Sequence, residues 1–142
     1  MEHQKLAEEF CEMHFLYAGK LDHLSEQISA IGEERVLFWL DRASQKVLSG
    51  ELAKNLDLTS GRMANILRNL ERKGYIHREN DIIDRRKVYV RLTDSGKNHF
   101  TNTYQETFRQ HEKLLNSLGD QDAAEFIRLL KKAYEFASKE KA

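Results

Sequence analysis

The densest cationic cluster of the chain lies at residues 84–87, where Asp84 is followed by Arg85, Arg86 and Lys87. Guanidinium groups bind phosphate oxygens and are attracted by the negative potential of the DNA minor groove, so the cluster suits a polyanionic partner. The chain carries 23 basic and 23 acidic residues, yet residues 60–91 hold nine Lys and Arg against four Asp and Glu. This local excess favours a nucleic-acid surface, and an ordinary solvated face is the alternative.

A second set of candidate binding residues follows one face of a predicted helix that begins near residue 60. At about 100° per residue the apolar side chains gather on one side of this helix. The opposite face holds only basic and amide side chains: Arg62, Asn65, Arg68, Asn69 and Arg72. Arginine pairs with guanine, asparagine pairs with adenine, and either can bind backbone phosphate. The pattern predicts a DNA recognition helix, capped at its N-terminus by Thr59 or Ser60.

These residues are expected to lie on a helix-turn-helix followed by a β-hairpin. Ser49 is expected to cap the first helix, and Gly74 to end the second. A strand beginning at Tyr75, the loop NDIIDRRK and a returning strand VYVRL complete the hairpin. A further short strand is expected at residues 45–47. This order predicts a winged helix, whose hairpin tip would lie over the groove beside the recognition helix.

The flanking segments are predicted to be helical. A stripe of apolar residues runs from Leu6 to Ile31, with an interruption near Gly19 and a break at Gly32, after which Glu33 and Glu34 begin a short helix. Towards the C-terminus, Thr93 is expected to cap a long helix, Gly119 to end it, and Asp120 to open a last one. These helices carry more apolar surface than the central segment can cover, which favours a homodimer.

The expected fold class is therefore mainly α with a small β-hairpin wing. Residues 1–142 are interpreted as a single domain, in which residues 33–93 form the winged helix-turn-helix DNA-binding lobe. Residues 1–31 and 94–142 are interpreted as dimerisation helices. No membrane segment or signal peptide is recognisable, so a cytoplasmic location is expected.

The segment from Gly50 to Lys97, GELAKNLDLTSGRMANILRNLERKGYIHRENDIIDRRKVYVRLTDSGK, resembles the core of the MarR (multiple antibiotic resistance regulator) family. The wing motif from Asp84 through the Arg-Arg pair to Leu-Thr and Gly96 is the most specific part. The resemblance implies a dimeric repressor that binds a palindromic operator. It also implies that Asp84 orients an arginine, with Arg86 in the minor groove and Arg85 as the rival. Thr59, Ser60, Arg62, Asn65 and Asn69 would approach the major groove.

Regulators of this family commonly respond to small aromatic or lipophilic effectors, to oxidation or to metals. Phe15, Arg35, Phe38 and Trp39 could line an effector pocket, since an aromatic wall with one cation suits an aromatic acid. Core packing is the alternative for these residues, above all for Phe38 and Trp39.

Two other classes of function remain open. A winged helix can act as a protein-interaction module, and a redox or metal sensor could act through Cys11 or the histidines. Nearby glutamates favour a neutral Cys11 thiol, and the six histidines lack metal-site spacing. No catalytic motif and no cofactor-binding motif is present, so an enzyme is not expected.

Overall fold

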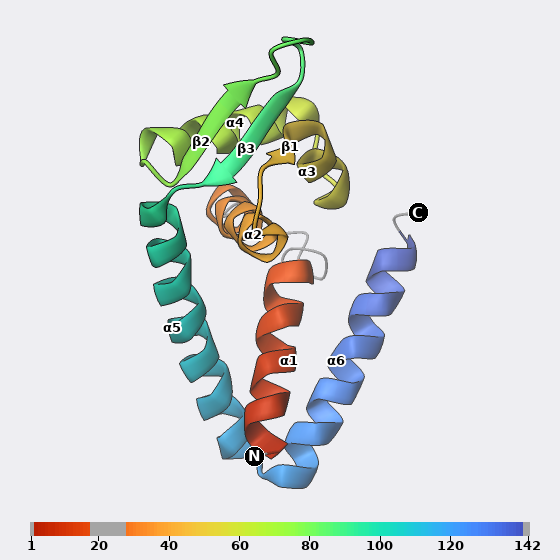
Figure 1. Cartoon of the computed structure of the whole chain (residues 1–142). Coiled ribbons are helices and arrows are strands. Elements are labelled where there is room, and N and C mark those ends of the chain that lie inside the picture. Colours follow the sequence, from red (N-terminus) through yellow and green to blue (C-terminus); the bar gives the residue numbers. More distant parts are fainter. Residues whose placement is uncertain (1, 18–27, 141–142) are drawn as a thin grey trace. The chain divides into compact units, whose positions relative to one another are not determined.

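The computed structural model describes residues 2–17 and 28–140 (Figure 1). Its elements are α1 (Glu2–Tyr17), α2 (Ile28–Ala43), β1 (Val47–Leu48), α3 (Ser49–Asn55), α4 (Ser60–Arg72), β2 (Ile76–Asn80), β3 (Val88–Leu92), α5 (Asp94–Leu118) and α6 (Asp120–Glu140). The chain divides into two compact units, described separately below: residues 27–101, the winged-helix unit, and residues 1–26 with 102–142, the helical unit. The predicted fold class is confirmed. None of the helices in the described ranges has the length and apolar character needed to cross a membrane.

The helix-turn-helix consists of α3 and α4. The turn between them is closed by the Leu58 backbone N–H, which donates to the Ala53 carbonyl at 2.9 Å, and by Asp57 in the left-handed region at φ 56°. Of the two predicted caps, Thr59 or Ser60, it is Thr59 that caps α4, because its Oγ1 accepts a hydrogen bond from the Arg62 backbone N–H at 3.2 Å. The buried face of α4 consists of Met63, Ile66, Leu67 and Leu70.

The expected N-cap at Ser49 is wrong. Leu48 occupies the cap position without a side-chain hydrogen bond, and Ser49 is the first residue of α3. The reason is that Leu48 is still paired with Tyr89 in the sheet, so β1 runs directly into the helix. The short strand predicted at residues 45–47 accordingly lies at Val47–Leu48.

The wing is a three-stranded antiparallel sheet with the order β1-β3-β2. Strand β2 pairs with β3 from Ile76 opposite Leu92 to Asn80 opposite Val88. It begins one residue later than predicted because Tyr75 still completes the end of α4. There the Tyr75 backbone N–H donates to the Leu70 carbonyl at 3.0 Å, beyond Gly74 at φ 81°.

Helix α2 passes through Gly32, so the predicted break at this residue is wrong. A Cβ atom at Gly32 would lie 2.8 Å from Cδ1 of Ile66, which shows that the glycine allows close packing of α2 against α4. The part of the predicted apolar stripe at residues 18–27, with its interruption near Gly19, lies outside the described residues.

The helical unit is built from α1, α6 and the part of α5 beyond residue 101. Its core consists of Ala7, Met13, Leu115, Ala123 and Ile127. Gly119, at φ 83°, separates α5 from α6 as predicted. Several large apolar side chains of this unit remain exposed, with Phe136 67% and Leu129 50% accessible.

Two histidines lie inside the helical unit. The His111 ring stacks on Phe10 with 3.8 Å between centroids, and His14 lies 5.3 Å from His111. Nε2 of His111 is buried without a hydrogen-bond partner among the described residues. Burial, and secondarily the charge of His14, lowers the pKa of His111 to about 4, and burial also lowers the pKa of His14. Both rings are therefore neutral in the folded protein at pH 7.

Acidification from pH 6.5 towards about 4 is expected to lower the free energy of unfolding, because the unfolded state binds protons on these histidines that the folded state excludes. Since the rings are only partly buried, we expect a loss of about 1–2 kcal/mol from the pair. Urea unfolding of wild type and His111→Phe across this range would test it. The variant should lose less stability than wild type, and parallel pH profiles would contradict the assignment.

Candidate nucleic-acid interface

Helix α4 presents the predicted polar face opposite its buried one. Asn65, Arg68 and Arg72 are exposed, whereas Arg62 and Asn69 are half-buried. The nearest carboxylate along the helix, Glu71, pairs instead with Arg78 of β2 at 2.9 Å. The hydrogen bond from Arg78 lowers the pKa of Glu71, which keeps the carboxylate ionised and engaged with the sheet. The polar face of α4 therefore carries only cationic and amide groups.

Within this face the arginines hold the asparagines. The Arg68 guanidinium donates to Oδ1 of Asn65, and that of Arg72 donates to Oδ1 of Asn69 at 2.7 Å. Spacing of three residues places such pairs side by side on a helix, although the polar pattern alone did not suggest their pairing. Each amide thus keeps its Nδ2 donors available for a ligand, and each guanidinium keeps further N–H donors.

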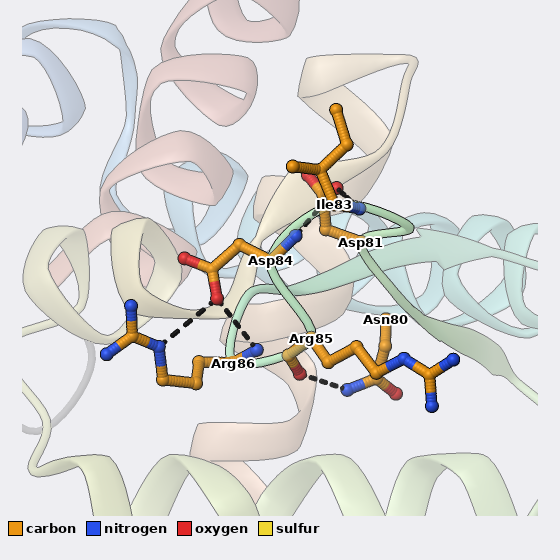
Figure 2. Close-up of polar contacts among 6 residues, drawn as sticks. All are labelled: Asn80, Asp81, Ile83, Asp84, Arg85 and Arg86. Atoms are coloured by element: carbon orange, nitrogen blue, oxygen red, sulfur yellow. Dashed lines mark hydrogen bonds and ion pairs between the residues drawn. The ribbon is translucent and has the colours of Figure 1, made fainter.

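The wing loop is held in one shape by its own polar groups, as Figure 2 shows. Asp81 Oδ1 accepts from the Ile83 backbone N–H at 2.8 Å, and Tyr89 donates its hydroxyl to Asp81 Oδ2 at 3.3 Å. The hydrogen bonds from the backbone N–H groups of Ile83 and Asp84 lower the pKa of Asp81. Asn80 donates its Nδ2 to the Arg85 carbonyl at 2.6 Å. Sequence reasoning missed Asn80 and Tyr89, although an Asx residue at a loop entrance signals this type of turn.

Asp84 pairs with Arg86 rather than with Arg85. Its Oδ1 accepts from Arg86 Nε at 3.2 Å and from the Arg86 backbone N–H at 3.1 Å (Figure 2). The Arg86 side chain is nevertheless 92% exposed, so its terminal nitrogens face solvent. Arg85 and Lys87 are also exposed. The geometry therefore presents one oriented guanidinium and two further cations at the loop.

The comparisons with known proteins agree with this geometry. Residues 35–110, more than half of the chain, match the family described as winged helix DNA-binding domain. The chain belongs to this family. Its relatives include the uncharacterised HTH-type transcriptional regulator YkoM of Bacillus subtilis, 32% identical over 83 residues, which are 58% of this chain and 54% of YkoM. The HTH-type transcriptional repressor YetL of the same organism is 25% identical over 85% of this chain and 76% of YetL. The chain thus spans about half the length of YkoM and about three quarters of YetL.

Solved structures give the same fold. Streptococcus pneumoniae FabT in complex with DNA has a TM-score of 0.66 and 26% identity, covering 90% of this chain and 85% of FabT. An Escherichia coli MarR mutant complexed with operator DNA has a TM-score of 0.56 and 27% identity, covering 94% and 88% of the respective chains. The winged-helix fold of this chain is therefore similar to that of FabT and of MarR.

The four predicted effector residues are divided between the two units. Phe15 is buried in the helical unit, where its ring lies 6.0 Å from that of Tyr104. Arg35, Phe38 and Trp39 belong to the winged-helix unit, where Arg35 and Phe38 are buried. Nε1 of Trp39 is buried without a hydrogen-bond partner in the described part of the chain. Phe38 packs within the winged-helix unit, where its ring lies 6.1 Å from that of Phe100. The effector pocket stays a prediction.

The redox and metal-sensor alternatives depend on Cys11 and on the histidines. Burial, followed by the charges of Glu12 and Glu8, raises the pKa of the Cys11 thiol to about 12. The side chain itself is fully buried. Among residues 2–17 and 28–140 there is no group of three His, Cys, Asp or Glu side chains arranged to hold a metal ion.

The thiol of Cys11 is expected to react with a disulfide reagent only on unfolding. At about pH 8 its thiolate fraction should be roughly a thousandfold below that of an unperturbed thiol, because its pKa is raised to about 12. The rate of reaction should fall with it, since only the thiolate is nucleophilic. Absorbance with Ellman's reagent, in buffer and in concentrated urea, measures both rates. Equal rates in the two solvents would show an accessible thiol and reopen the redox alternative.

Proposed function

We propose that the protein is a transcriptional regulator, acting as a repressor, that binds a palindromic operator as a homodimer. The observation that carries the proposal is the acid-free polar face of α4 beside a wing that presents the oriented Arg86 guanidinium. The relatives add support, because YetL is named a repressor and both FabT and the MarR mutant were solved with DNA. DNA as the partner implies that the protein acts in the cytoplasm.

In this proposal α4 enters the major groove. Asn65 and Asn69 read base edges with the amide groups that Arg68 and Arg72 hold in place. Thr59, Ser60 and Arg62 lie at the N-terminal end of the helix, where backbone N–H groups also favour phosphate. Most of the affinity comes from phosphate contacts and falls with salt, whereas the asparagines supply sequence choice.

The wing supplies the second contact. Arg86 enters the minor groove while Asp84 positions its guanidinium, and Arg85 and Lys87 contact phosphates on either side. Dimerisation uses the apolar side chains that the helical unit leaves exposed, namely Leu114, Leu118, Leu129 and Phe136. A small aromatic or lipophilic effector modulates DNA binding.

The alanine variant of Asn65 tests the reading role. We expect Asn65→Ala to reduce discrimination between a selected operator and random duplex by about 1–3 kcal/mol, while random binding changes little. The operator is obtained by selection from a random duplex library, and both affinities are measured by fluorescence anisotropy. Lys87→Ala, in the wing, is the control for loss of charge, because it leaves the hydrogen bond from Arg68 to Asn65 in place. It should weaken both kinds of binding and reduce the salt dependence, because it removes a charge.

Two results would contradict the proposal. Equal losses of Asn65→Ala on operator and random DNA would remove Asn65 from the base-reading residues. Failure of the wild-type protein to bind any duplex, even at low salt, would favour a winged helix that docks another protein.

A further inference from the structure

The tip of the wing carries two adjacent isoleucines in full contact with solvent. Ile82 and Ile83 are each 95% exposed, more than any other large apolar residue that the structure leaves accessible. Single exposed apolar side chains are common on protein surfaces. Ile82 and Ile83 differ from such single residues because they are adjacent, and the loop of the projecting hairpin (Figure 1) gives them nothing to pack against.

The loop cannot easily withdraw these side chains. Asp81 holds the Ile83 backbone N–H at 2.8 Å and is itself bound by Tyr89. The base of the loop is closed by the Asp81 N–H, which donates to the Lys87 carbonyl at 2.9 Å, and by the Lys87 N–H, which donates to the Asp84 carbonyl at 3.0 Å. The isoleucines are therefore presented in one backbone shape before any partner binds.

The surroundings of the tip indicate what covers it. Both carboxylates beside the isoleucines are engaged within the loop, Asp81 with backbone N–H groups and Asp84 with Arg86. The groups left facing outward are apolar side chains and the cations of Arg85, Arg86 and Lys87. This combination fits a polyanion with an apolar interior, and stacked base pairs behind phosphates provide one.

We infer that Ile82 and Ile83 form an apolar wedge that enters the minor groove next to Arg86 and opens a base step at the outer flank of the operator. The inference rests on the proposed function. Separating the bases at a step costs energy that depends on sequence, and pyrimidine–purine steps such as TA and CA open most easily. The wedge therefore makes the protein prefer such a step at a position that forms no hydrogen bond with it.

Selection from a random duplex library tests the inference, because the selection itself finds the operator sequence. Full-length wild type, the double variant Ile82→Ala/Ile83→Ala and the conservative double variant Ile82→Leu/Ile83→Leu are each used for selection. We expect wild type and the leucine variant to enrich a central motif together with a flexible step at its flanks. The alanine variant should enrich the same central motif without the flanking step.

Affinity and bending provide the second readout on the wild-type selected duplex. The alanine variant should bind about tenfold more weakly, because apolar contact area is lost, with the same dependence on salt, because no charge is removed. Energy transfer between dyes at the duplex ends should show less bending than with wild type. All three proteins should unfold at the same temperature, since both side chains are exposed.

The outcomes separate the wedge from the regulator proposal. A central motif with the same flanking step and equal affinity for the alanine variant would overturn the wedge and leave the proposed function intact. A central motif without any flanking preference in wild type would do the same. Failure of all three proteins to enrich any motif would overturn both proposals together.

Discussion

Replacing Arg86 with alanine is expected to weaken DNA binding by about 1–3 kcal/mol, the usual loss for one charged groove contact. The Arg86 side chain is 92% exposed, and its one bonding partner among the described residues is Asp84, so the substitution should leave the fold intact. One fewer cation on the DNA also means one fewer counterion released. The slope of log affinity against log salt should therefore become shallower by about one.

Anisotropy of a labelled mixed-sequence duplex at two salt concentrations measures both effects. Arg85→Ala is the matched control, since it removes the same charge one position earlier without touching the Asp84 ion pair. We expect a similar change of slope but a smaller loss of affinity for this control. If Arg85→Ala loses more DNA affinity than Arg86→Ala, Arg85 is the residue that enters the minor groove, and the ion pair of Arg86 with Asp84 only closes the loop.

The largest expected loss of stability comes from Gly96, in the first turn of α5. A Cβ atom at this position would lie 2.0 Å from the Tyr75 carbonyl oxygen and 2.8 Å from its carbonyl carbon. The contact is with backbone atoms that cannot rotate away. The same carbonyl accepts the Thr93 N–H at 3.1 Å, and Thr93 Oγ1 donates to the Gly74 carbonyl at 2.6 Å. Gly96→Ala must therefore pull α5 away from the end of α4, at a cost of about 3 kcal/mol or more.

Urea unfolding measures the predicted loss, and Gly32→Ala is the control. A Cβ atom at Gly32 would approach only the Cδ1 end of the Ile66 side chain, which can move aside. Alanine also has the higher helix propensity, so this second variant should be close to neutral. If Gly96→Ala has the same free energy of unfolding as wild type, α5 can shift freely against residues 74–75.

The parts of the fold that follow from local sequence were predicted well. The polar face of α4, its Thr59 cap and the stop at Gly119 depend on periodicity and on backbone preferences of single residues. The errors arose where tertiary packing decides. Serine is a favoured N-cap residue, but Ser49 directly follows a strand whose last residue, Leu48, occupies the cap position. Glycine often ends a helix, but Gly32 lies within α2 where this helix packs against α4.

The same distinction applies to the candidate interface. Residue types and spacing were sufficient to find the cations of α4 and of the wing. The resemblance implied that Asp84 orients an arginine, but it left open whether the partner is Arg86 or Arg85. Residue types and spacing could not reveal that Asn80 binds the Arg85 carbonyl or that Arg68 binds Asn65, because side-chain pairing depends on rotamers and loop geometry. They also did not single out Ile82 and Ile83, since their exposure follows from the shape of the loop.

The strand order β1-β3-β2 has a consequence for solubility. The two edges of this sheet are a strand of two residues and a strand of five, and the longer one carries His77, Arg78 and Glu79 in succession. Short and charged edges resist the addition of a strand from another molecule. The exposed pair of isoleucines could otherwise promote cross-β association between molecules. The short and charged edge strands of the sheet to which the pair is attached oppose it.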